Sequence, residues 1–186
     1  MTMTPALRKL TLTGHIICSV GWIGAVMTYL ALDVTVATSQ DAEILRAAYL
    51  MMALITRYVI VPLALASLLT GIVISLFTHW GLFQHYWVVI SLLLTFIATV
   101  VLLSETQIIS RLADIAGNPT TSGDTLRALP NTLVHSIGGT VVLLLITVLN
   151  VYKPHGLTPY GWRKQQAARL ERHEKSQVSP AIDGTT

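Results

Sequence analysis

The sequence predicts an all-α, polytopic membrane protein: a four-helix transmembrane bundle with both termini in the cytoplasm. Three observations predict it. The chain of 186 residues is 53% hydrophobic and only 11% charged, which is about half the charged fraction of an ordinary soluble domain. Its apolar residues lie in long blocks rather than alternating with polar ones, and its lysines and arginines gather near the two ends of the chain.

Four apolar blocks, at about 10–32, 58–78, 87–104 and 133–152, are long enough to cross a bilayer, which takes roughly 20 helical residues. The first block follows two basic residues, as in a signal peptide, but it exceeds the roughly 7–15 apolar residues of a cleavable one. We therefore predict a retained helix. The transmembrane domain would cover 1–164, and 165–186 would form a polar, partly disordered cytoplasmic tail, in which 165–176 is compatible with a short helix.

The orientation follows from the positions of the basic residues. Eight of the 12 lysines and arginines precede the first block or follow the last one: Arg8, Lys9, Lys153, Arg163, Lys164, Arg169, Arg172 and Lys175. The connections on the other side balance their arginines with acidic residues. The positive-inside rule then puts both termini in the cytoplasm. This charge pattern describes topology, so the expected partner is the lipid bilayer and not nucleic acid.

The second helix is expected to begin well before the membrane. The sequence is helix-compatible over 41–78, which is nearly twice the thickness of the hydrocarbon core. Pro62 predicts a kink, and the segment Ile44–Thr56 would project outward or lie on the outer interface. The connection over 105–132 contains GNPTTSGD, which predicts a mobile loop.

Small residues recur at the spacing of packed membrane helices. Ser67, Gly71 and Ser75 repeat every four residues, and Gly21 with Ala25 and His135 with Gly139 share this spacing. Small faces let membrane helices approach closely. They predict a compact bundle, and they are also compatible with a homo-oligomer or a partner membrane subunit.

The stretch GHIICSVGWIG carries a His15–x6–Trp22–x–Gly24 pattern. It resembles the first helix of the CopD copper-resistance family and of the HemJ-type protoporphyrinogen oxidases. This resemblance implies metal or tetrapyrrole chemistry with His15 as the candidate ligand. It also implies a lysine early in the third helix, where this chain has Ser91.

Three longer stretches, VPLALASLLTGIVISL, THWGLFQHYWVVISLLLT and VLNVYKPHGLTPYGWRKQ, look closer to another group. They are similar to a family of uncharacterised bacterial integral membrane proteins, usually described as a domain of unknown function. The resemblance covers about residues 10 to 165. It implies a multi-pass protein of the bacterial inner membrane, and it implies no activity.

Two histidines, His15 and His135, lie inside predicted membrane helices. Neutral histidine is a common metal ligand and can also hold haem iron. On the predicted topology the two differ in depth by something near 20 Å, at about 1.5 Å per residue, whereas a metal lies about 2 Å from its ligand atoms. They are therefore expected in two separate half-sites.

Each half-site has its own candidate partners. On the inner side, His15 would meet His79 or His85 of the inner loop. On the outer side, a haem b with His135 and Met27 as axial ligands and Arg57 facing a propionate is chemically coherent. Copper(I) held by His135 with Met27, Met51 or Met52 is also coherent. The alternative without a cofactor is an interfacial network of Asp33, Arg57 and Glu105, with His135 bonded to a carbonyl across the bundle.

Three functions remain open from the sequence. They are a protein that binds b-type haem or a porphyrin, a CopD-like copper handler at the outer surface, and a non-catalytic membrane subunit or scaffold. The chain has no HExxH motif, no phosphate-binding glycine loop and a single cysteine, Cys18, so it predicts no zinc site and no catalytic residues of those classes.

Overall fold

The structure, a computed structural model, describes residues 4–77, 83–154 and 156–178, with side chains up to Arg172. Its elements are α1 (Pro5–Thr38), α2 (Ala42–Ile55), the π-helical turn η1 (Thr56–Ile60), α3 (Val61–Phe77), α4 (Tyr86–Gly117), α5 (Gly123–Ala128), α6 (Leu133–Tyr152) and α7 (Pro159–Val178). The described residues contain helices and one isolated bridge between His85 and Leu157. The predicted all-α class is therefore confirmed.

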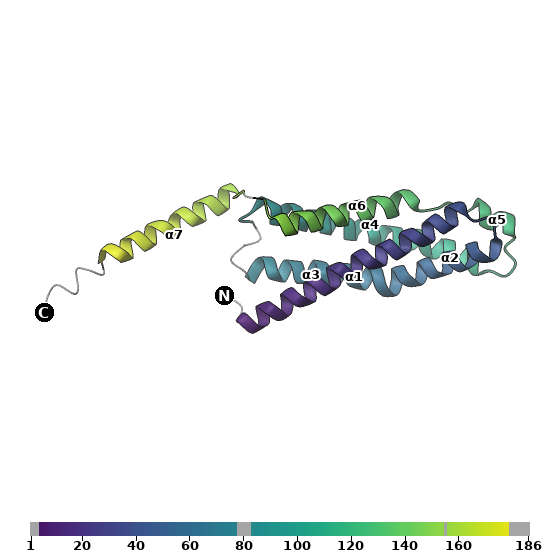
Figure 1. The fold of residues 1–186 in the computed structure, drawn as a ribbon, viewed down its shortest axis with the longest axis horizontal. Helices are drawn as coiled ribbons and strands as arrows, with labels where there is room; N and C mark the ends of the chain where they lie inside the picture. Colours follow the sequence, from purple (N-terminus) through teal and green to yellow (C-terminus); the bar gives the residue numbers. More distant parts are fainter. Residues whose placement is uncertain (1–3, 78–82, 155, 179–186) are drawn as a thin grey trace.

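The bundle consists of α1, the continuous α2–η1–α3 rod, α4 and α6, which run side by side along one long axis (Figure 1). These 4 helices are long and apolar enough to cross a membrane, as predicted. We call the end where α1 begins and α6 ends the termini end, and the opposite end, which carries α5, the α5 end (Figure 1).

Three of the bundle helices extend beyond the predicted apolar blocks, whereas α6 covers 133–152 as predicted. The extension of α4 to Gly117 has a clear cause. Beyond Glu105, the residues Ile109, Leu112 and Ala116 form a buried face in a part of α4 that packs against α2. Much of the predicted mobile loop is therefore helix, because an amphipathic stripe gains apolar contact there. The remainder contains α5, whose N-cap Ser122 accepts a hydrogen bond from the Thr125 N–H at 3.2 Å.

The segment Ile44–Thr56, expected outside the membrane or on its surface, belongs to the bundle at the α5 end. Asp41 caps the start of α2, and Leu45, Ala48, Tyr49 and Met52 form its buried face. This face packs against α1 and α4.

The π-helical turn η1 ends two residues before Pro62. Proline has no N–H to donate and its ring crowds the carbonyl four residues earlier, so a wider turn accommodates it. The sequence predicts a kink in the helix at Pro62. Next to Pro62 the structure has this π-helical turn. Within this turn, Thr56 and Ile60 are the side chains that face the inside of the bundle.

Glycines bring α1 and α3 close together, as the small-residue spacing predicts. A Cβ added to Gly21 would lie 3.3 Å from Leu63 Cδ1, and one added to Gly71 would lie 3.3 Å from His15 Cε1. Gly139 does not have the predicted packing role, because nothing lies within 4 Å of where its Cβ would be. It faces a cavity instead.

Helix α7 leads away from the bundle (Figure 1) and is longer than the predicted helix at 165–176. The residues just before α7 bond to the chain at the start of α4: the Thr158 N–H donates to the Gln84 carbonyl at 3.0 Å, and the Tyr86 N–H donates to the Gly156 carbonyl at 3.3 Å. Any side chain at Gly161 would overlap the Gln84 backbone. The final part of the predicted disordered tail, 179–186, lies outside the described residues.

Candidate functional site

The described residues line a cavity near each end of the bundle. The termini cavity, of about 690 Å³, is lined by α1, α3, α4 and α6 and contains His15. The α5-end cavity, of about 310 Å³, contains His135. Both volumes are in the range of ligand-binding pockets. No residue lines both cavities, in agreement with the prediction that His15 and His135 belong to separate half-sites.

His15 of α1 is fixed by α3. Its Nδ1 lies 3.1 Å from the Ser67 carbonyl oxygen and 2.9 Å from Thr70 Oγ1. A carbonyl oxygen only accepts, and the Thr70 hydroxyl already donates to the Ala66 carbonyl at 2.6 Å, so we assign the proton to His15 Nδ1. In the neutral ring, Nε2 is then a lone-pair acceptor, and it has no hydrogen-bond partner among the described residues.

Other polar side chains line the same cavity. Ser91 of α4 is buried and its Oγ has no hydrogen-bond partner among the described residues. Arg8 and Lys153 line the cavity at the start of α1 and the end of α6, and Asn150 lies one turn before Lys153. The cavity therefore combines apolar walls with two cations at one end and a histidine and a serine deeper inside.

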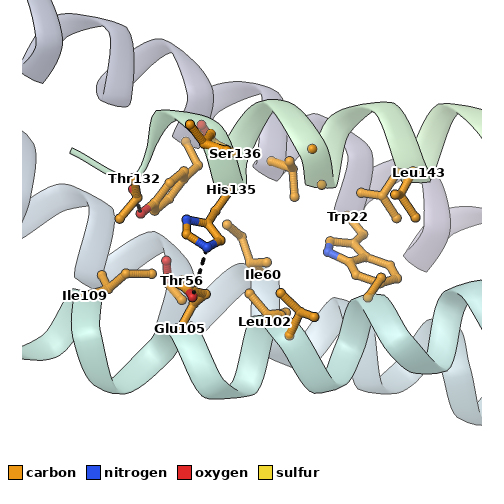
Figure 2. Close-up of a pocket in the computed structure, with 18 of the residues that line it drawn as sticks. Trp22, Thr56, Ile60, Leu102, Glu105, Ile109, Thr132, His135, Ser136 and Leu143 are labelled. Carbon is orange, nitrogen blue, oxygen red and sulfur yellow. Dashed lines mark hydrogen bonds and ion pairs between the residues drawn. The ribbon is translucent and has the colours of Figure 1, made fainter. Parts of the chain in front are cut away.

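The α5-end cavity is lined mainly by α4 and α6, and α1 and η1 also contribute to it. Figure 2 shows Thr56, Glu105, Thr132 and His135 gathered at one end, with Trp22 at the other. Gly138 and Gly139 also line it, and no atom lies within 4 Å of the Cβ position of either glycine. The wall formed by α6 is consequently flat at these two positions, before Val142 and Leu143.

His135 and Glu105 face each other across this cavity. His135 Nε2 lies 3.4 Å from Glu105 Oε1, and the exposed fractions of the two side chains are 57% and 16%. A separation of 3.4 Å is at the long end for a hydrogen bond, so the pair is a weak contact. Beside it, the Oγ1 of buried Thr56 has no hydrogen-bond partner among the described residues.

Asp33 is part of a different cluster, which holds the start of α6. One carboxylate oxygen accepts from the Thr132 N–H at 3.1 Å, and the other accepts from the Thr132 hydroxyl at 3.0 Å and the Ser136 hydroxyl at 2.7 Å. The Tyr29 hydroxyl lies 2.7 Å from Thr132 Oγ1, and it donates there because the single Thr132 hydroxyl proton goes to Asp33.

The predicted network of Asp33, Arg57 and Glu105 is wrong. Glu105 pairs with His135, whereas Arg57 stacks on the neighbouring Tyr58 ring, 5.8 Å from its centroid. The cause is the helical phase: Arg57 is on the exposed face of η1, next to inward-facing Thr56.

The predicted partners of His135 are also elsewhere. Met27, with 48% of its surface exposed, and exposed Arg57 do not line the cavity that contains His135. Of the other candidate copper ligands, Met51 is exposed and Met52 is buried in the face of α2. The structure therefore does not assemble the predicted haem site of His135, Met27 and Arg57, or the predicted copper site.

The proposed inner partners of His15 have different outcomes. His79 lies outside the described residues. His85 is at the N-cap of α4, with its ring 6.4 Å from that of Trp87, and it does not line the termini cavity. In the described part of the chain, no group of three or more His, Cys, Asp or Glu side chains is positioned to hold a metal ion.

Sequence reasoning did not identify two polar groups as cavity-facing: Thr56 was not singled out, and Ser91 was noted only where the resemblance implies a lysine. Ser91 and Thr56 are single hydroxyls in apolar helices, where such residues usually bond to a carbonyl of their own helix. Only their lack of a partner distinguishes them, and this is a property of the tertiary structure.

Comparison with known proteins adds nothing further, since no protein-family model, no curated protein and no solved structure matches this chain.

Proposed function

We propose that this protein binds a b-type haem or a related porphyrin in the termini cavity, with His15 as the axial ligand. The observation that carries the proposal is the orientation of the His15 ring. Its Nδ1–H donates to the Ser67 carbonyl, which leaves Nε2 for a ligand. Histidines that bind metals are typically held in this way, with the second ring nitrogen donating to a carbonyl, because that bond fixes the tautomer and the ring orientation.

The other residues of the termini cavity fit the same class of ligand. Its volume of about 690 Å³ and its apolar walls suit a large flat ring. Arg8 and Lys153 are suited to two carboxylates, because a cation next to a carboxylate forms a charge-assisted hydrogen bond. Among the described residues, no second histidine, methionine or cysteine lines the cavity, so His15 is the candidate iron ligand within that part of the chain.

The test is a visible absorption spectrum of detergent-purified protein from haem-replete cells, oxidised and then reduced with dithionite. We expect a Soret band, and α and β bands that sharpen on reduction. His15→Gly is expected to lose this spectrum and to recover it when free imidazole is added, because imidazole replaces the missing ring. Porphyrin without iron would be detected by its red fluorescence.

The matched control is His135→Gly, which removes the histidine of the other cavity. It is expected to keep the full spectrum. A wild-type protein without absorbance or porphyrin fluorescence would contradict the proposal, and so would His15→Gly protein that keeps the bands without imidazole.

We further propose that the termini end faces the cytoplasm of a bacterium and that the α5 end faces outward. Basic residues near the termini end support this orientation. In a Cys18→Ser background, Asp124→Cys on α5 is expected to react with a membrane-impermeant maleimide in spheroplasts. Gln165→Cys on α7 is expected to react only after the membrane is opened. The reverse labelling pattern would invert the topology.

A further inference from the structure

We propose that the α5-end cavity binds a lipid-soluble quinone. The proposal concerns His135, Glu105 and Thr56, and it does not rest on the function proposed for His15. Three features of the cavity carry it: an opening on the side of the bundle, a flat wall, and hydrogen-bonding groups at one end only.

The opening follows from the exposure of the lining residues. Ile97 and Val101 of α4, exposed by 48% and 45%, and Val134 of α6, exposed by 81%, line the cavity. The cavity is thus reached between α4 and α6, through an apolar surface of two membrane-crossing helices. A ligand that enters there comes from the lipid and is itself mainly apolar.

The flat wall favours a ligand with a planar ring. Gly138 and Gly139 offer no side chain, and the space next to them is open. Trp22 closes the far end of the cavity (Figure 2). A planar ring stacks well in such a space. The volume of about 310 Å³ suits a ring with the first part of a chain, and the rest of a long chain would extend through the opening into the lipid.

The polar end of the cavity favours a ligand whose ring carries carbonyl or hydroxyl groups. The Thr56 hydroxyl is buried without a partner, which costs free energy unless a ligand completes its hydrogen bonding. It can donate to a carbonyl oxygen of a ring. His135 and Glu105, 3.4 Å apart, supply a donor and an acceptor at the same end. A quinone offers ring carbonyls and its quinol form offers hydroxyls, whereas an acyl chain offers neither.

Trp22 provides the readout, because quinones quench tryptophan fluorescence at short range and this residue lines the cavity. The experiment titrates detergent-solubilised His15→Gly protein, which lacks the proposed haem, with decylubiquinone. We expect saturable quenching of the intrinsic fluorescence. Trp22→Phe is expected to remove most of the saturable quenching. The chain has 4 tryptophans, and the others are still present in this variant.

Thr56→Val removes the unpaired hydroxyl and keeps the shape of the side chain. It is expected to weaken quinone binding about tenfold, the equivalent of one lost hydrogen bond. The matched control is Thr99→Val, since Thr99 is a buried threonine of α4 that lines neither cavity. It should bind as the parent protein does. Gly139→Leu is expected to abolish binding by filling the cavity.

Three results would overturn the proposal. The first is quenching that stays unchanged in Trp22→Phe, which would put the quinone elsewhere. The second is an equal loss of affinity in Thr56→Val and Thr99→Val. The third is displacement of decylubiquinone by decanol at equal concentration, which would show that the cavity takes any apolar chain and does not recognise the ring.

Discussion

Asp33→Ala is expected to lower the free energy of unfolding by about 3 kcal/mol, as when one partner of a buried charged group is removed. The Asp33 carboxylate is fully buried and accepts three hydrogen bonds from Thr132 and Ser136. Thr132 is the N-cap of α6, and its own side chain makes no capping bond. A negative charge from α1 therefore stabilises the positive end of the α6 dipole, and alanine leaves the buried donors there without their acceptor.

The measurement is an equilibrium unfolding titration with SDS in mixed micelles. Asp33→Asn keeps the size of the side chain and one acceptor oxygen, so it should lose about half as much stability as the alanine variant. Asp114→Ala is the matched control, because Asp114 is an exposed acid on α4, and its change should lie within about 0.5 kcal/mol of zero. Equal stability of Asp33→Ala and Asp114→Ala would contradict the assigned role.

Arg46→Ala has the second-largest expected effect, a loss of about 2 kcal/mol. Arg46 of α2 donates to the carbonyls of Ala116 and Asn118, the latter at 2.8 Å, and to that of Thr121 at 3.2 Å. The last carbonyls of a helix have no partner within the helix, and a cation at this end also complements the dipole. One guanidinium thus closes the end of α4 and holds the chain that leads to α5.

The same SDS titration measures this effect. Arg46→Lys keeps the charge but cannot donate to several carbonyls in a fixed plane, so it should recover only part of the lost stability. Arg111→Ala removes an exposed arginine of α4 and serves as the control. If Arg46→Lys were as stable as the parent, charge alone would explain the contribution of Arg46, and the capping geometry would be unnecessary.

The positions of the two cavity histidines followed from the sequence, whereas their surroundings did not. Helix length and the 1.5 Å rise place His15 and His135 at different depths, and each lines its own cavity. The predicted neighbours of His135 failed because sequence position gives depth but leaves rotation about the helix axis undetermined. Val26 lines the cavity that contains His135, whereas the next residue, Met27, is exposed and does not line it.

The length of the helices was partly predictable. The block at 133–152 matches α6 because hydrophobicity ends there abruptly, and Lys153 closes the helix in a left-handed conformation with φ of 45°. For α4, the apolar block ends before Glu105 but the helix continues to Gly117. A weaker amphipathic stripe extends it, and that stripe is stable only because α2 is present to cover it.

The sequence by itself determined the class of fold and the number of membrane-crossing helices, since a bilayer demands long apolar segments whose backbone bonds are satisfied internally. It also determined that two histidines lie inside those helices. The tertiary structure decided which polar groups meet. Asp33 contacts the start of α6 and Arg46 the end of α4, and Ser91 and Thr56 face cavities without partners. These contacts depend on the rotation and spacing of packed helices, which arise from side-chain packing across the whole bundle and not from any local stretch of sequence.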